Sequence, residues 1–217
     1  MNIYKFSKKI HSLSLSDLFP SVPRLFRNDT VSGFEPSEFI NRKYIDDLSL
    51  PKTLFVQTED VIVSNTADET SLVGAGVGSV TLPADFLTAG KTLICKLHGR
   101  LSGANALAVT IKIKIGETTL ITCTGNLSEA LDNVPFEAEL FLTCRTIGET
   151  GTIFAQGSTT IYSAPGIGTT CGRALAMDAP VVVDTTLEQD IDVTYQFGAA
   201  AETNNIKVSD LTIGAIN

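Results

Sequence analysis

Histidine is the side chain best suited to acid–base chemistry and metal binding near neutral pH, and the sequence contains two of them. His11 stands in a basic, serine-rich stretch, whereas His98 lies among alternating apolar residues, with Lys96 and Arg100 two positions away on either side. A catalytic triad needs a histidine between a nucleophile and a carboxylate, and zinc sites commonly use several histidines or cysteines. Neither arrangement is indicated here, and we interpret His98 as a surface residue of a strand.

Carboxylates near residue 190 form a second candidate. Asp190 and Asp192 stand two positions apart, so a strand places both on one face, with Glu188 nearby. Such pairs can act as general acid and base or bind Ca²⁺. Carboxylates on the wet side of a strand are also what solubility alone produces, and the same two interpretations apply to Asp178 and Asp184. We therefore predict no catalytic residue, no metal ligand and no cofactor.

Residues 74–79, GAGVGS, have the glycine content of a phosphate-binding loop. The G-x-G-x-x-G spacing fails because Ser79 occupies the last position, and the following SVTLP predicts a strand instead of the helix that would hold a phosphate. We interpret the segment as a connection at which backbones approach closely. The sequence has no P-loop, no G-x-S-x-G elbow and no H-E-x-x-H motif.

The cysteines form no C-x-x-C pair, and three of them lie within alternating apolar patterns. This placement indicates small buried residues with free thiols in a reducing compartment, although one disulfide would fit the sequence as well. The four are Cys95, Cys123, Cys144 and Cys171.

Composition and charge restrict the partners of this chain of 217 residues. Charged residues make up 18% of the chain, less than the roughly 25% of an average domain, which indicates that sister subunits cover part of the surface. Residues 1–50 hold seven Lys and Arg against six Asp and Glu, and the remainder holds nine against eighteen. An acidic body argues against nucleic acid as a partner. We also expect no secretory signal and no membrane span, because no long apolar run occurs.

Hydrophobic periodicity divides the chain into an N-terminal arm, residues 1–50, and a body, residues 51–217. In the body apolar residues recur at every second position, which is typical of antiparallel sheets covered on one side. We predict an all-β, antiparallel, jelly-roll-like β-sandwich, with 163–180 as a long end loop. The expected strands are 53–66, 70–74, 79–83, 91–101, 107–115, 119–124, 134–147, 152–162, 180–184, 188–198 and 205–213.

The arm contains one expected helix, residues 36–48. Ile40, Tyr44 and Leu48 recur every four residues, and Phe39 widens this apolar stripe. A helix of about three turns does not stay folded alone in water, so the stripe must rest on the body or on a neighbouring molecule. We expect these four residues to dock onto another protein.

Three local features of the body follow from turn chemistry and apolar parity. A three-residue loop after Ile115 would put Ile121 and Cys123 on the same face as the preceding isoleucines, and we favour it over a two-residue loop at 116–117. Apolar parity slips by one at residues 209–210, which predicts a bulge. Residues 83–87 are expected to form one helical turn.

Three runs of the body resemble modules of tailed-phage virion proteins, the jelly-roll domains of head fibres, decoration proteins and tail appendages. The runs are NTADETSLVGAGVGSVTLPADFLTAGKTL (65–93), TGTIFAQG (150–157) and DTTLEQDIDVTYQFGAAAETNNIKVSDLTI (184–213). The resemblance covers roughly residues 56–215 and carries no defining site motif, so no site residues are transferred. It implies a trimeric β-sandwich attached to a bacteriophage particle by an N-terminal segment.

The functional hypothesis is a non-enzymatic structural component of the virion, assembled in the host cytoplasm. It would bind copies of itself through the β-sandwich and another virion protein through residues 1–50. The alternative is a receptor- or glycan-binding appendage module that uses end loops such as 163–179. The sequence has no Trp and four Tyr, so the flat aromatic platforms on which sugar rings stack are scarce.

Overall fold

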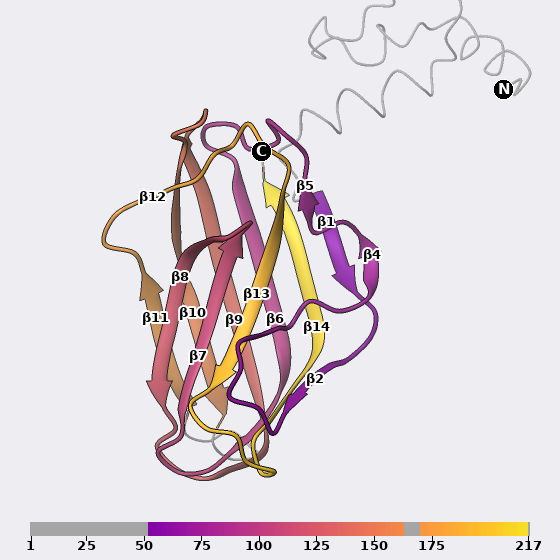
Figure 1. The fold of residues 1–217 in the computed structure, drawn as a ribbon, viewed down its shortest axis with the longest axis vertical. Coiled ribbons are helices and arrows are strands. Elements are labelled where there is room, and N and C mark those ends of the chain that lie inside the picture. Colours follow the sequence, from indigo (N-terminus) through magenta and orange to yellow (C-terminus); the bar gives the residue numbers. More distant parts are fainter. Residues whose placement is uncertain (1–51, 163–169, 217) are drawn as a thin grey trace, which may run out of the picture. The chain divides into compact units, whose positions relative to one another are not determined.

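The computed structural model describes residues 52–162 and 170–216, with the backbone alone at residues 170–175. Every regular element in these ranges is a β-strand, and the strands pair antiparallel in two sheets (Figure 1). The all-β, antiparallel prediction is confirmed for this part of the chain, while the jelly-roll topology stays a prediction. The expected helix at 36–48, with Phe39, Ile40, Tyr44 and Leu48, lies outside the described residues.

The large sheet has nine strands, and its central path runs in the order β11-β10-β9-β6-β14-β1-β4. Two short strands lie off this path, β12 against β10 and β2 against β14. The nine strands are β1 (Lys52–Gln57), β2 (Val61–Ser64), β4 (Gly76–Gly78), β6 (Thr92–Gly103), β9 (Leu131–Thr146), β10 (Thr152–Tyr162), β11 (Thr170–Ala176), β12 (Val181–Val182) and β14 (Asn205–Ile216).

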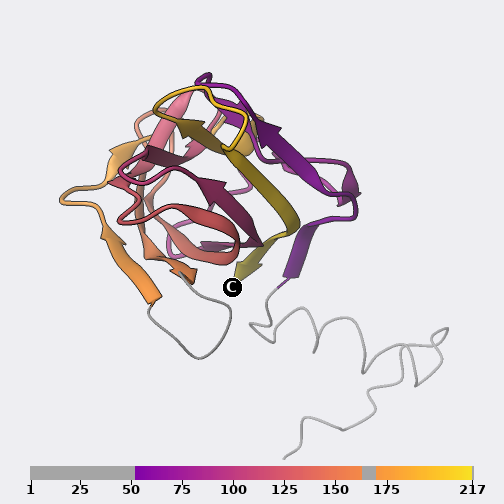
Figure 2. The same ribbon diagram turned by 90° about the horizontal axis from the view of Figure 1, so that it is seen from below.

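The small sheet has five strands in the order β3-β13-β7-β8, with β5 also paired to β13. It packs face to face against the large sheet, in front of it in Figure 1, and the view along the strands in Figure 2 shows the two layers curving around a common interior. The five strands are β3 (Thr70–Ser71), β5 (Thr81–Leu82), β7 (Ala108–Ile115), β8 (Thr118–Asn126) and β13 (Gln189–Phe197).

The core lies between the sheets and is built by the alternation that the sequence shows. In β9 every second side chain from Val134 to Cys144 is buried, and in β13 the same holds from Ile191 to Phe197. Each fully buried Leu, Ile or Phe side chain stabilises the folded state by about 1.5–3 kcal/mol relative to exposure, so this alternation fixes the face and the register of each strand.

Two strands form where periodicity did not predict them, and one expected strand is interrupted. The expected strand 53–66 is divided into β1 and β2, which both pair with β14. Residues 170–176 form β11, within the predicted loop 163–180, because they pair with β10 along their whole length. Pairing with a neighbour, and not an apolar pattern, makes this segment a strand.

The glycine-rich segment 74–79 contains the other unexpected strand, β4. A Cβ atom at Gly76 would overlap the carbonyl oxygen of Val56, and one at Gly78 would overlap that of Leu54. Gly78 also has a φ of 97°, which side chains of L-residues rarely allow. The close backbone approach inferred from the sequence is therefore confirmed.

The turn between β7 and β8 differs from the expected loop, yet its consequence is as expected. The loop has two residues, Gly116 and Glu117, and the ladder shifts by one residue between Ile113 and Lys114. This bulge restores the alignment of Ile113 with Ile121 and of Ile111 with Cys123. The predicted three-residue loop is wrong because a bulge inside the ladder corrects the register just as an extra loop residue would.

Two smaller predictions have opposite outcomes. The ladder between β14 and β6 shifts between Val208 and Asp210, which confirms the bulge at 209–210. Residues 83–87 do not form a helical turn. Phe86 donates its backbone N–H to the Pro83 carbonyl at 3.1 Å, and Asp85 has a φ of 58°, so the segment is a tight turn.

Candidate functional site

The histidine and carboxylates singled out from the sequence lie on outer faces of the sandwich. His98 Nδ1 is 3.1 Å from Asp210 Oδ2 on the large sheet, and both side chains are half exposed. Asp192 accepts a hydrogen bond of 2.6 Å from the Ser71 hydroxyl on the small sheet, and Asp190 is exposed. Among the described residues, no group of three or more His, Cys, Asp or Glu side chains is placed to hold a metal ion.

The remaining predicted carboxylates have local roles. Asp184 accepts hydrogen bonds from the backbone N–H of Thr186 at 2.9 Å and from its hydroxyl at 2.6 Å, which fixes the turn before β13. Asp178 is exposed, and so is Glu188. None of the five carboxylates considered is joined to another by a recorded contact in the described part of the chain, so the structure assembles no acid–base pair from them.

The three cysteines whose side chains are described have free thiols. Cys95 is buried, which raises the pKa of its thiol to about 12, and burial also raises the pKa of the Cys144 thiol. Thiols of this kind stay protonated and act as apolar side chains. Cys123 is partly exposed and differs from the other two, because it lines a cavity. The side chain of Cys171 lies outside the described residues.

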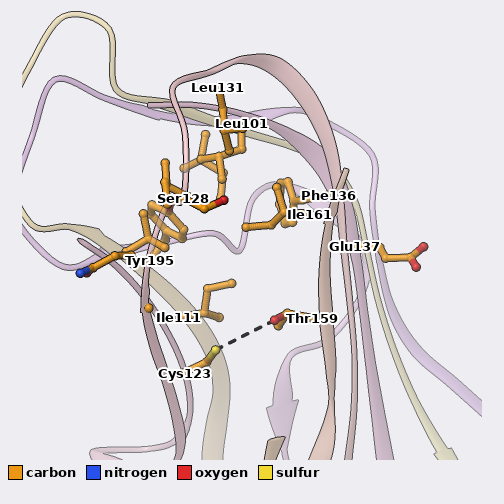
Figure 3. Close-up of a pocket in the computed structure, with 15 residues that line it drawn as sticks. Leu101, Ile111, Cys123, Ser128, Leu131, Phe136, Glu137, Thr159, Ile161 and Tyr195 are labelled. Carbon is orange, nitrogen blue, oxygen red and sulfur yellow. Dashed lines mark hydrogen bonds between the residues drawn. The ribbon is translucent and has the colours of Figure 1, made fainter. Parts of the chain in front are cut away.

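This cavity has a volume of about 90 Å³ and lies between the two sheets, at the end of the sandwich where β7 begins and β8 ends. Tyr195, Ile111 and Cys123 line it from the small sheet. Figure 3 shows the side chains of the large sheet on the opposite side, and Leu101, Ser128 and Leu131 close one end. The principal large-sheet side chains are Phe136, Thr159 and Ile161.

Small side chains explain why the core is not filled at this point. In the large sheet Thr159 stands opposite Ala138, and in the small sheet Val109 stands opposite Gly125. Sheets packed face to face lie about 10 Å apart, and rows of small residues on both inner faces leave part of that space empty. The Cys123 Sγ and Thr159 Oγ1 atoms, 4.0 Å apart, bridge the two sheets beside the cavity.

The Tyr195 hydroxyl is the unusual polar group of this site. Tyr195 is 1% exposed, and its oxygen is one of two buried side-chain polar atoms of the described residues that have no hydrogen-bond partner. Its ring packs edge-on against Phe197, with centroids 4.8 Å apart. Burial raises the pKa of the phenol, so it stays protonated. A buried hydroxyl without a partner costs about 1–3 kcal/mol, which a bound group with an oxygen or nitrogen atom could offset.

Charged groups do not face this cavity. Glu137 is the one charged residue among those lining it, and Figure 3 shows its carboxylate pointing away. That carboxylate accepts a hydrogen bond of 2.8 Å from the Tyr162 hydroxyl instead. The arrangement can therefore bind an uncharged molecule, and it places no base or nucleophile pair next to a bound molecule. The sequence indicates that Tyr195 faces inward, but no signal in it marks the cavity.

The sequence predicts few exposed aromatic rings on which a sugar could stack. One partly exposed ring, that of Phe154, lies on the outer face of the large sheet. The Arg145 guanidinium lies 4.3 Å from the centroid of this ring. The Phe154 ring face is therefore occupied by a cation–π contact.

Exposed apolar side chains gather at two other places. Val77 on β4 is 71% exposed and Ile62 on β2 is 59% exposed, at the edge of the large sheet. Ile147, Val182 and Leu187 form a second group, the end patch. Their segments are held together by the pairing of Thr152 with Val182 and by a 3.1 Å hydrogen bond from the Thr185 N–H to the Gly148 carbonyl.

Neither the known protein-family models nor the curated proteins match this sequence. Solved structures with some likeness include the CBM2 module of the evolved Dit of Lactobacillus casei BL23 phage J-1, with 9% identity, 63% of this chain and 67% of that chain covered, and a TM-score of 0.26. A protein of unknown function from Shewanella oneidensis MR-1 has 14% identity, 86% and 96% coverage, and a TM-score of 0.33. An alginate lyase from Klebsiella pneumoniae has 8% identity, 59% and 60% coverage, and a TM-score of 0.22. These values are low, and no conclusion about function rests on them.

In the described ranges, 52–162 and 170–216, no helix is long and apolar enough to span a bilayer.

Proposed function

We propose that the protein is a non-enzymatic structural component of a bacteriophage particle, with a jelly-roll body that associates with copies of itself, as a trimer, and an arm, residues 1–50, that attaches it to another virion protein. The resemblance of three sequence runs to tailed-phage virion modules supports this proposal. The observation that carries it is the exposed apolar edge of the large sheet.

This edge combines unpaired backbone with apolar side chains. β4 is the last strand of the large sheet, and its backbone pairs with β1 on one side. Val77 stands opposite Val56 in this ladder, and Ile62 lies further along the same edge, opposite Lys207 of β14. An edge strand of this kind is a template for another chain, and proteins normally protect such edges with charge, proline or a covering segment. Closed association with sister copies would protect it here.

β1, the first strand of the body, begins at the end of the sandwich that carries the end patch. Lys52, the first residue of β1, pairs with Ala215 of β14, and Ala215 pairs with Leu93 of β6. Leu93 in turn pairs with a residue in the last part of β9, so all four strands are level at this end. Ile147, in the end patch, directly follows β9. We propose that this end faces the virion and that the opposite end, with the cavity, faces outward.

Light scattering on the full-length chain tests self-association. The wild type should have the mass of a trimer, and a variant with both Val77→Asp and Ile62→Asp should have the mass of a monomer, because two desolvated charges would oppose edge contact. A variant with both Thr119→Asp and Thr122→Asp is the matched control, since it puts the same two charges at exposed positions of β8, an edge strand of the small sheet, and should leave the mass unchanged. A monomeric wild type would contradict the proposal.

A further inference from the structure

We propose that the cavity between the sheets is a binding site for a small, uncharged, ring-containing molecule that carries one hydrogen-bonding oxygen, recognised by the Tyr195 hydroxyl. The site lies away from the exposed edge of the large sheet. The proposal therefore does not depend on the proposed structural role.

The lining of the cavity consists mostly of apolar side chains, which favour an apolar ligand. Val109, Ile111, Cys123 and Ile161 keep partial exposure although they pack against the core, and all four line the cavity. Apolar side chains at the inner faces of a sandwich are normally covered by the opposite sheet. An apolar molecule between them would complete the packing that the two sheets leave open.

Tyr195 supplies the second, independent observation. Tyr195 is one of the residues that line the cavity, and its buried hydroxyl has no hydrogen-bond partner among the described residues. Polar atoms in this position are normally paired, so an unpaired one beside an empty space indicates a missing partner. A protonated phenol can donate to a carbonyl or hydroxyl oxygen of the ligand, or accept from its hydroxyl.

Size and polarity favour a ring over water. A closed apolar cavity of about 150 Å³ binds benzene. The present one is smaller, about 90 Å³, and partly open, so a single ring is the largest group that it suits, with one end of the molecule at the opening. A stable buried water needs two to four polar partners. Around this cavity the Thr159 hydroxyl is already in contact with the Cys123 thiol, and the Glu137 carboxylate points away. Asn126 and Ser128 also line the cavity, but apolar side chains form most of its wall, which favours a ring over ordered water.

Fluorine NMR on the full-length protein tests the site with two probes, 4-fluorophenol and fluorobenzene, which differ by one hydroxyl group. Both should bind saturably, and 4-fluorophenol should bind about five- to tenfold more tightly because it pairs with Tyr195. Their ring protons should give intermolecular NOEs to the methyl groups of Ile111 and Ile161. Absence of saturable binding by both probes would overturn the proposal.

Two variants separate the contributions of the hydroxyl and of the space. Tyr195→Phe should remove the difference in affinity between the probes while fluorobenzene binding is kept. Ile161→Phe should fill the cavity and weaken both probes, whereas Ile147→Phe, the same change at an exposed position of the end patch, should weaken neither. Equal binding by wild type and Ile161→Phe would place the probes elsewhere and overturn the proposal. If Ile161→Phe does not fold, the NOEs in the wild type decide the question.

Discussion

Glu69 accepts a hydrogen bond of 2.8 Å from the hydroxyl of Thr194, a residue 125 positions further along the chain. Its second oxygen, Oε2, pairs with Lys112. The oxygen that accepts from Thr194, Oε1, also lies 3.7 Å from Lys114 Nζ. Glu69 directly precedes β3, whereas Thr194 and the lysines belong to β13 and β7. One carboxylate thus fastens the segment before β3 to the outer face of the small sheet, a role that its sequence context does not reveal.

This contact predicts an acid-sensitive contribution to stability. The hydrogen bond from Lys112, followed by that from Thr194, lowers the pKa of Glu69 below its usual value. A carboxyl group whose pKa is lower in the folded state stabilises that state above its unfolded pKa, and the contribution disappears as the pH falls below about 5 and through the folded pKa. Glu69→Gln should therefore be less stable than wild type at pH 7, and the difference should shrink at pH 3.

Thermal unfolding followed by circular dichroism at both pH values measures this effect. The size at pH 7 should be modest, about 1 kcal/mol or less, because the group is partly exposed and solvent screens the pair. Glu117→Gln, in the exposed turn between β7 and β8, is the matched control and should differ little from wild type at either pH. A stability gap for Glu69→Gln that is as large at pH 3 as at pH 7 would refute the electrostatic explanation.

Core packing gives a larger expected effect. Leu97 is fully buried, and its neighbours in the adjacent strands are Ala138 and Leu211. Leu97→Ala removes buried methyl groups and leaves a hole, so it should lower the free energy of unfolding by about 2–5 kcal/mol. Leu187→Ala, in the exposed end patch, should change it by about 0.5 kcal/mol or less. Urea unfolding measures both, and equal losses would contradict the two-sheet core.

Glycine substitutions separate backbone strain from steric overlap. Gly78 and Gly148 both have positive φ values, 97° and 106°, but a Cβ atom would overlap the Leu54 carbonyl oxygen at Gly78 and would have no neighbour within 4 Å at Gly148. Gly148→Ala should cost about 1–3 kcal/mol from strain alone. Gly78→Ala should cost more and should detach β4 from β1. Hydrogen exchange of the β1 amide groups would detect this detachment, and unchanged protection in Gly78→Ala would show that β4 tolerates a side chain.

The arm is tested by particle attachment. Replacing Phe39, Ile40, Tyr44 and Leu48 together by alanine removes the apolar stripe, so the full-length protein should remain folded and self-associated but should no longer be incorporated into phage particles. Asn41→Ala, within the same segment and outside the stripe, should be incorporated normally. The measurement is the amount of the protein in purified particles, and normal incorporation of the fourfold variant would show that the stripe is not the anchor.

Much of the fold was readable from the sequence because strand alternation is a local property. Phe136 and Leu140 in β9, like Ile191 and Val193 in β13, face the core as their spacing predicts. The bulge at residues 209–210 was predicted in the same way, because the alternation of apolar residues shifts by one position there. The two-residue turn at Gly116 was missed because a bulge in the ladder and a longer loop have the same effect on the pattern of side chains.

What the sequence determined by itself is the set of two-faced strands and the inward direction of Tyr195. Tertiary structure decided which strands pair, so it made β11 from a segment without periodicity and joined Glu69 to Thr194. It also decided that Val109, Gly125 and Thr159, from three different strands, line one cavity together with Tyr195. The physical reason is that side-chain direction depends on neighbours along the chain, whereas an empty space depends on the volumes of residues that only folding brings together.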